Sequence, residues 1–142
     1  REAALDRALE RGVDVIYTGM VPHSEAPDYY RLGDIFVTAS TSETQGLTYF
    51  EALAAGVPVL CRRDPCVDGV VEDDVNGWQY EDAKSFGRYL SAFCGDAALR
   101  ERMSREAQLS SERFSAEAFG AAVAALYVSV QKEAMPAVSG ER

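Results

Sequence analysis

Short apolar runs alternate with helical patterns along the first half of this 142-residue chain. Three of the runs read as strands: VDVIYTG (13–19), DIFVTAS (34–40) and VPVLC (57–61). Two helical patterns separate them, APDYYRLG (26–33) and GLTYFEALAAG (46–56). Strands that alternate with helices of about 8–12 residues are typical of βαβ units and a parallel sheet. The sequence therefore predicts an α/β fold.

Capping signals divide the rest of the chain. Gly12 suits the end of an opening helix over residues 1–12, REAALDRALERG. We expect a turn at Asn76 and Gly77, followed by a short strand around Trp78. Three further helices are expected, each beginning after a capping residue, namely Asp82, Asp96 and Ser115. Their apolar stripes are Phe86, Leu90 and Phe93; Leu99, Met103 and Ala107; and Phe119, Ala122, Val123, Leu126 and Val130.

Length, charge and cysteine content limit the class of protein. We expect one domain over residues 1–131, followed by a disordered tail over residues 132–142. The net charge of −9, from 23 acids and 14 bases, argues against nucleic acid as a partner. The odd number of cysteines, three, fits reduced thiols in a cytosolic protein, and their spacing does not favour a metal site. The apolar run AFGAAVAALYVSV (118–130) is too short to span a bilayer.

The turn STSETQG (40–46) stands where an open parallel sheet binds ligands, beyond the carboxyl end of a strand. The helix that follows offers unpaired N–H groups and the positive end of its dipole, which suit a phosphate. Gly46 would let the ligand approach the backbone closely. Glu43 and Glu51 then need another partner, because carboxylates accept hydrogen bonds from hydroxyl groups. A diphosphate flanked by a sugar and a ribose, as in a nucleotide sugar, satisfies all of these groups.

Spacing alone also allows a simpler interpretation. Glu51 fits equally a solvated helix position, and Glu43 a favourable charge near a helix N-terminus. The remaining polar residues are expected at the surface: His23 in a loop, and Arg62 and Arg63 after a strand. We expect Tyr29 and Tyr30 to pack at the core and its rim.

The run SETQGLTYFEALAAGVPVL (42–60) resembles the E-x7-E signature of the retaining glycosyltransferases with the two-domain GT-B architecture, the glycosyl transferases group 1. The order of the flanking motifs is also similar to that family: YTGMVP (17–22), YYRLGDIFVTAS (29–40) and DGVVEDDVNGWQY (68–80). This resemblance covers about residues 13–115. It implies a Rossmann-like, doubly wound parallel sheet that forms the donor-binding domain. It also implies that the family's first strand, its glycine-rich loop and its N-terminal acceptor domain lie outside this chain.

The resemblance assigns roles to individual residues. Glu43 matches the catalytic glutamate beside the donor sugar, and Glu51 matches the glutamate that holds the ribose hydroxyls. In that family, the turn before the helix and the first turn of the helix contact the sugar and the diphosphate. The residues of this chain at those positions are Thr44, Gln45, Gly46, Leu47 and Thr48. The strand end beside the base is matched by Gly19, Met20 and Val21. The resemblance implies neither a cofactor nor a metal.

The sequence SETQGLTYFEA resembles that of bacterial members of the family that transfer hexoses to lipid or saccharide acceptors. We therefore expect a UDP-sugar such as UDP-glucose as donor, a cytoplasmic location at the inner face of the membrane, and peripheral membrane association of the whole enzyme. The chain alone should be inactive and should self-associate weakly. Two alternatives are a nucleotide-sugar enzyme of the epimerase type and a binding module without catalysis. A phosphoacceptor module would need an aspartate at a strand end, whereas Asp34 begins its strand.

Overall fold

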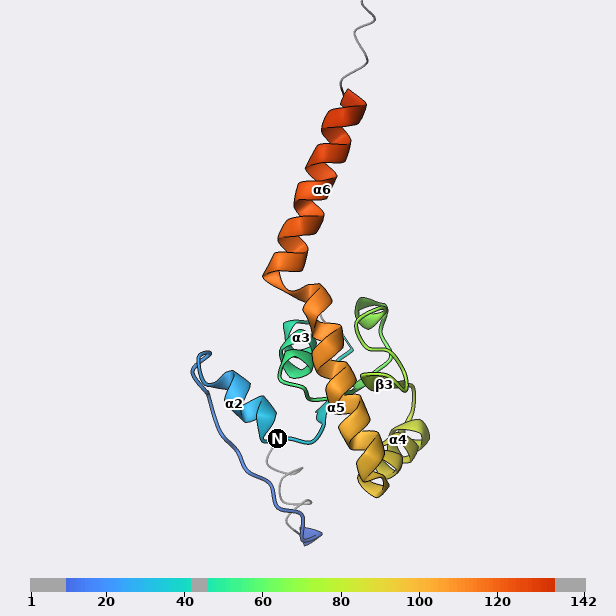
Figure 1. The fold of residues 1–142 in the computed structure, drawn as a ribbon. Coiled ribbons are helices and arrows are strands. Elements are labelled where there is room, and N and C mark those ends of the chain that lie inside the picture. Colours follow the sequence, from blue (N-terminus) through green and yellow to red (C-terminus); the bar gives the residue numbers. More distant parts are fainter. Residues whose placement is uncertain (1–9, 42–45, 135–142) are drawn as a thin grey trace, which may run out of the picture.

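The computed structural model describes residues 10–41 and 46–134. Its centre is a parallel sheet of three strands in the order β1-β2-β3: β1 (Phe36–Thr38), β2 (Val59–Arg62) and β3 (Gly77–Tyr80). Phe36 is in register with Val59, and Leu60 with Trp78. Figure 1 shows the helices gathered around this small sheet and one helix that leaves it. The predicted α/β fold with a parallel sheet is confirmed.

The central strand β2 is apolar because both of its faces are covered. Val59 and Cys61 belong to a cluster with buried residues of α3 (Leu47–Ala54). Leu60 points to the other face and packs with Trp78 and with Phe93 of α4 (Ala83–Gly95). Helix α5 (Ala97–Ser111) contributes to both clusters: Met103 packs in the cluster of Leu60, and Ala107 packs in the cluster of Val59.

The predicted caps are present and fix where the later helices begin. Asp82 accepts a hydrogen bond from the backbone N–H of Ser85, and Ser85 completes a capping box. Asp96 accepts from the N–H of Leu99 at 3.0 Å. The hydroxyl of Ser115 accepts from an N–H in the first turn of α6 (Ala116–Ala134) at 3.1 Å. The apolar stripes predicted for α4 and α5 face the sheet, so these two helices pack as expected.

The loop before β3 is built around a buried side chain. It contains the short helix η1 (Pro65–Val67), and its turn ends at Asn76, one residue earlier than predicted. Asn76 is fully buried, and Gly77 is already the first residue of β3. A Cβ at Gly77 would collide with the carbonyl oxygen of Val59 on the neighbouring strand. Close approach of two strands, more than a tight turn, therefore requires this glycine.

Helix α6 projects from the body of the molecule after a short link, η2 (Glu112–Phe114), as Figure 1 shows. Most of its apolar stripe faces solvent: Phe119 is 71% exposed and Leu126 is 63% exposed. The helix continues to Ala134, past the domain boundary that we predicted at residue 131. Residues 135–142 of the predicted tail lie outside the described residues.

The strand predicted over residues 13–19 is wrong. In the structure this segment has no strand pairing and leads to α2 (Ala26–Arg31) as the irregular trace drawn in blue in Figure 1. Val13 and Ile16, which would have faced a core, are 52% and 87% exposed. A β-branched run forms a strand only where it can pair and bury a face, and no described segment supplies that surface. Most of the predicted opening helix, residues 1–9, lies outside the described residues, although Gly12 has the expected φ of 69°.

The helical stretch Ala97–Lys132, which runs through α5, η2 and α6, is long and apolar enough to cross a membrane by length and composition. The prediction from the 13-residue run counted only uninterrupted apolar residues, whereas the helix that carries the run continues on both sides of it. Length and composition alone are weak evidence of a span, and the α5 part of the stretch belongs to the core through Met103.

Candidate functional site

The N-terminus of α3 lies at the edge of the sheet where β1 and β2 end, because α3 is the connection that follows β1. Gly46 precedes the helix with a left-handed φ of 58°, and as the N-cap residue it has no side chain with which to cap the first turn. A Cβ at Gly46 would lie 2.8 Å from the Tyr49 ring, so both conformation and space favour glycine here. Leu47 and Thr48 are exposed. Gly46 itself is buried, so at this edge the first turn presents Leu47 and Thr48 to solvent.

Glu51 lies one turn further along α3 and has a specific partner. The hydroxyl of Tyr30, on α2, donates a hydrogen bond of 2.8 Å to Oε2 of Glu51. Burial, and then the hydrogen bond and charge of Glu51, raise the pKa of Tyr30 to about 12. The phenol therefore stays neutral and remains a donor at physiological pH. Glu51 is half-buried beside α2, so the interpretation as a simply solvated carboxylate does not hold.

Two adjoining hollows flank Tyr30. The first, between α2 and α3, is lined mainly by apolar atoms together with His23, Tyr30 and Glu51. The second is lined by Thr18, Val21, Ala26, Tyr29, Tyr30 and Phe36. Ala26 and Tyr30 border both. The structure thus places Val21 and Glu51, two of the predicted binding residues, on either side of one tyrosine.

The remaining predicted residues are less enclosed. Met20 is fully exposed, and Gly19, with a φ of 70°, lines neither hollow. Glu43, Thr44 and Gln45 lie outside the described residues, so their roles stay predictions.

Sequence reasoning missed two of the residues around this site. His23 is exposed, as predicted, but it also borders the hollow that contains Glu51. Tyr30 was assigned to packing, and its hydrogen bond to Glu51 was not foreseen. Its position 21 residues before Glu51 has no periodic relation to that residue, so no sequence signal joined the two.

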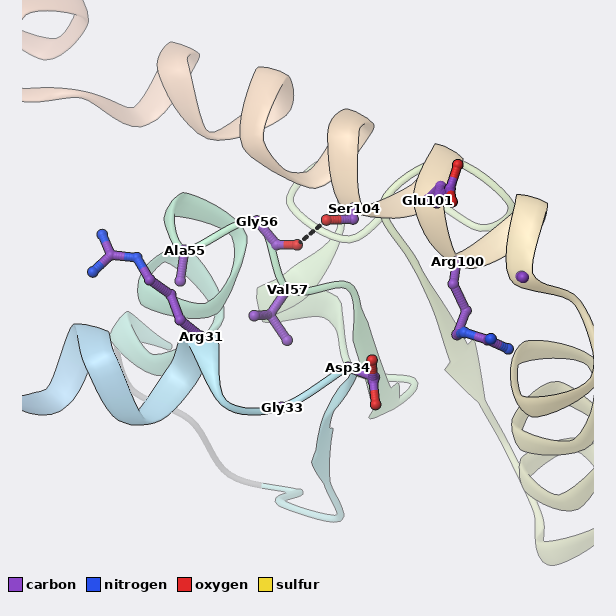
Figure 2. Close-up of a pocket in the computed structure, with 10 residues that line it drawn as sticks. Arg31, Gly33, Asp34, Ala55, Gly56, Val57, Arg100, Glu101 and Ser104 are labelled. Carbon is purple, nitrogen blue, oxygen red and sulfur yellow. Dashed lines mark hydrogen bonds between the residues drawn. The ribbon is translucent and has the colours of Figure 1, made fainter.

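A further hollow lies at the opposite edge of the sheet (Figure 2). It is formed by the segments that precede β1 and β2 together with α5, and Asp34, Gly56 and Val57 are part of its wall. Ser104 of α5 donates a 2.7 Å hydrogen bond to the carbonyl oxygen of Gly56, which fastens α5 to the end of α3. Ligands of open parallel sheets bind at the carboxyl edge, so this hollow at the amino edge is not where we expect a ligand.

Charged and nucleophilic residues elsewhere have structural explanations. Arg63 forms surface ion pairs with Asp73 and Glu81, as its predicted solvated position allows. Burial, more than any charge, raises the pKa of the Cys61 thiol to about 12, which makes this cysteine unreactive. Over residues 10–41 and 46–134, no group of three or more His, Cys, Asp or Glu side chains could hold a metal ion.

Comparison with known proteins identifies a family. The family model described as "Glycosyl transferases group 1" matches residues 1–110 of the chain. That match includes both hollows around Tyr30, all of α3 and the whole sheet.

Two curated relatives carry the same printed name, alpha-monoglucosyldiacylglycerol synthase. The protein from Streptococcus pneumoniae is 38% identical over 121 residues, which is 84% of this chain and 27% of the relative. The protein from Acholeplasma laidlawii is 34% identical over 110 residues, which is 78% of this chain and 28% of the relative. The chain therefore spans little more than a quarter of the length of either relative.

A solved structure shows the same fold. The C-terminal domain of a glycosyl transferase group 1 family protein from Francisella tularensis superposes with a TM-score of 0.67 at 24% identity. The superposition covers 77% of this chain and 58% of that domain. At this level of identity the likeness concerns the fold alone.

Proposed function

Because the chain belongs to the glycosyl transferases group 1 family, we propose that it is the donor-binding part of a retaining hexosyltransferase. The donor would be a nucleotide sugar, UDP-glucose or a similar compound. The observation that carries the proposal is the position of Glu51: its carboxylate stands beside the hollow between α2 and α3, one turn after the N-terminus of α3. A ribose at Glu51 and a diphosphate at the helix N-terminus fit this spacing.

The chemistry assigned to these groups is electrostatic. When the bond between sugar and diphosphate breaks, negative charge develops on the leaving group, and backbone N–H groups at the start of α3 would stabilise it. This explains how a chain of net charge −9 could bind an anion without a basic face. Glu43 would position the donor sugar near the reaction centre. Leu47, Thr48 and the preceding turn would contact the diphosphate and the sugar largely through the backbone.

The acceptor belongs to the whole protein. The names of the two curated relatives describe a synthase of a glucosylated diacylglycerol. A lipid or saccharide acceptor is therefore the proposal, with the enzyme at the cytoplasmic face of the membrane. The acceptor would bind to a second domain that faces the carboxyl edge of this sheet.

Two substitutions in the full-length protein test the division of roles. Glu51→Ala removes the ribose acceptor and is expected to weaken UDP binding about ten- to a hundredfold, the effect of a lost hydrogen bond to a charged group. Glu43→Ala should leave UDP binding unchanged and reduce turnover. Calorimetry with UDP measures the first effect, and a transfer assay with UDP-glucose and diacylglycerol vesicles measures the second. Glu117→Ala, an exposed acid in the first turn of α6, is the matched control.

Equal loss of UDP affinity in both variants would contradict this division. Conversion of the UDP-sugar to an epimer in the absence of any acceptor would favour the epimerase alternative and overturn the transferase proposal.

A further inference from the structure

We propose that Tyr30 is a positioning residue of the donor site, whose hydroxyl holds the Glu51 carboxylate in the orientation that accepts the ligand's hydroxyl groups. The proposal rests on the proposed function and adds to it a residue outside the glutamate motif. It also assigns α2 a role in nucleotide binding, because Tyr30 lies on that helix.

The geometry shows that the tyrosine is itself held in place. Its ring meets Phe36 of β1 edge to face, with ring centroids 5.6 Å apart. Phe36 in turn meets Tyr49 of α3 at 6.3 Å, again edge to face. Tyr49 is almost fully buried. The phenol is therefore anchored through two aromatic contacts to the core, and its hydroxyl is presented to Glu51 from a fixed point.

Counting hydrogen-bond sites leaves room for a ligand. The Tyr30 hydroxyl donates to Oε2 of Glu51 at 2.8 Å and uses one acceptor position. An ionised carboxylate has about four lone-pair positions on two oxygens, so acceptor positions remain for a pair of neighbouring hydroxyl groups. A ribose carries such a pair. Without the phenol, the glutamate would have to lose its rotamer freedom on binding, which weakens the complex.

The position of Tyr30 fits this role better than a purely structural one. Tyr30 borders both hollows, with Glu51 in one and Val21 in the other. A nucleotide whose ribose contacts Glu51 and whose base lies toward Val21 would pass over this tyrosine. The bond that joins α2 to α3 thus connects two residues that both line the hollow between these helices.

The test compares UDP with 2′,3′-dideoxy-UDP on the full-length protein. The wild type should prefer UDP, because only UDP offers hydroxyl groups to Glu51. Tyr30→Phe keeps the ring and its contact with Phe36 but removes the donor. We expect it to bind UDP about tenfold more weakly and to discriminate less between the two nucleotides. In turnover, KM for the donor should rise while kcat changes little.

A double-mutant cycle shows whether Tyr30 affects UDP binding through Glu51 or independently of it. If Tyr30 acts through Glu51, Tyr30→Phe should cost little further affinity in a Glu51→Gln background. Tyr127→Phe, which removes the same atom from an exposed tyrosine of α6, is the matched control. Thermal unfolding checks that Tyr30→Phe remains folded, and loss of UDP affinity with an unchanged midpoint supports the proposal.

The outcomes that would contradict the proposed function differ from those that would contradict the role of Tyr30. A wild-type protein that binds no UDP contradicts the proposed function and, with it, this role of Tyr30. If the wild type binds and discriminates but Tyr30→Phe retains both properties, only the role of Tyr30 is overturned. Tighter UDP binding by Tyr30→Phe, or fully additive losses in the cycle, would also overturn it.

Discussion

The amide of Asn76 donates a 2.9 Å hydrogen bond to the hydroxyl of Ser110, which joins the loop before β3 to the end of α5. The same amide donates to the carbonyl oxygen of Val70, and its oxygen accepts from the N–H of Glu72. One fully buried side chain thus organises a loop that has little secondary structure of its own. This loop supports β3, and β3 supports one side of β2.

Asn76→Ala should lower the free energy of unfolding by about 2–4 kcal/mol, because buried backbone groups lose their partners. Ser110→Ala removes one of these partners and should cost about 1 kcal/mol. Urea unfolding followed by circular dichroism measures both values. An Asn76→Ala variant no less stable than Ser110→Ala would contradict the central place of Asn76 in the loop.

Gly77→Ala should destabilise the protein by about 2–4 kcal/mol, because the new methyl group meets the carbonyl oxygen of Val59 and the side chain of Val71. Gly87→Ala is the matched control. Gly87 lies inside α4, and an added Cβ would meet no atom within 4 Å apart from its chain neighbours and the backbone of its own helix, so alanine should stabilise the helix by about 1 kcal/mol. The two substitutions should therefore shift the thermal midpoint in opposite directions, and shifts of the same sign would refute this assignment.

The cap at Asp82 should make stability depend on pH in the acid range. Hydrogen bonds from the backbone and side chain of Ser85 hold the pKa of Asp82 below its ordinary value of 3.8. The cap therefore contributes its full stability above pH 3.8, and the contribution is lost as the pH falls through the lowered pKa.

Asp82→Asn keeps an oxygen acceptor but cannot titrate. Wild type should be more stable than this variant near pH 6, and the difference should shrink as the pH falls below 3.8. Urea midpoints measured between pH 6 and pH 2 check the sign. A difference that stays constant over that range would show that the carboxylate charge plays no part.

The apolar face of α6 should cause weak self-association of the 142-residue chain. Phe119, Leu126 and Val130 lie on one side of the helix and are mostly exposed. Leu126→Asp should shift the chain toward monomer in light scattering across a concentration series. Ala121→Asp adds the same charge on the opposite side of the helix and should have no such effect. A wild-type chain that stays monomeric at high concentration would refute the expectation.

The 142-residue chain should not transfer sugar, because the proposed active site needs a second domain for the acceptor. It should still bind UDP, although more weakly than the full-length protein. Calorimetry with UDP and a transfer assay with UDP-glucose and diacylglycerol vesicles measure the two properties separately. Turnover by the chain alone would contradict the two-domain site.

Local signals were enough for several elements. The caps at Asp82, Asp96 and Ser115 and the apolar run of β2 were predicted correctly from the sequence. Each depends on residues within one or two turns, or on burial that makes a whole run apolar. The same reasoning failed for residues 13–19, because a strand depends on a partner that its own sequence does not contain.

The sequence also determined the family, because the order of motifs is a linear property. The edge of the sheet at which a ligand would bind stays a prediction. Only the tertiary structure brought Tyr30 to Glu51 across 21 residues and Asn76 to Ser110 across 34. Only the tertiary structure showed that Gly77 is needed for its closeness to Val59 and not for a turn. The reason is physical: hydrogen bonds and steric contacts depend on distances of a few ångströms, and packing brings together residues that no sequence period connects.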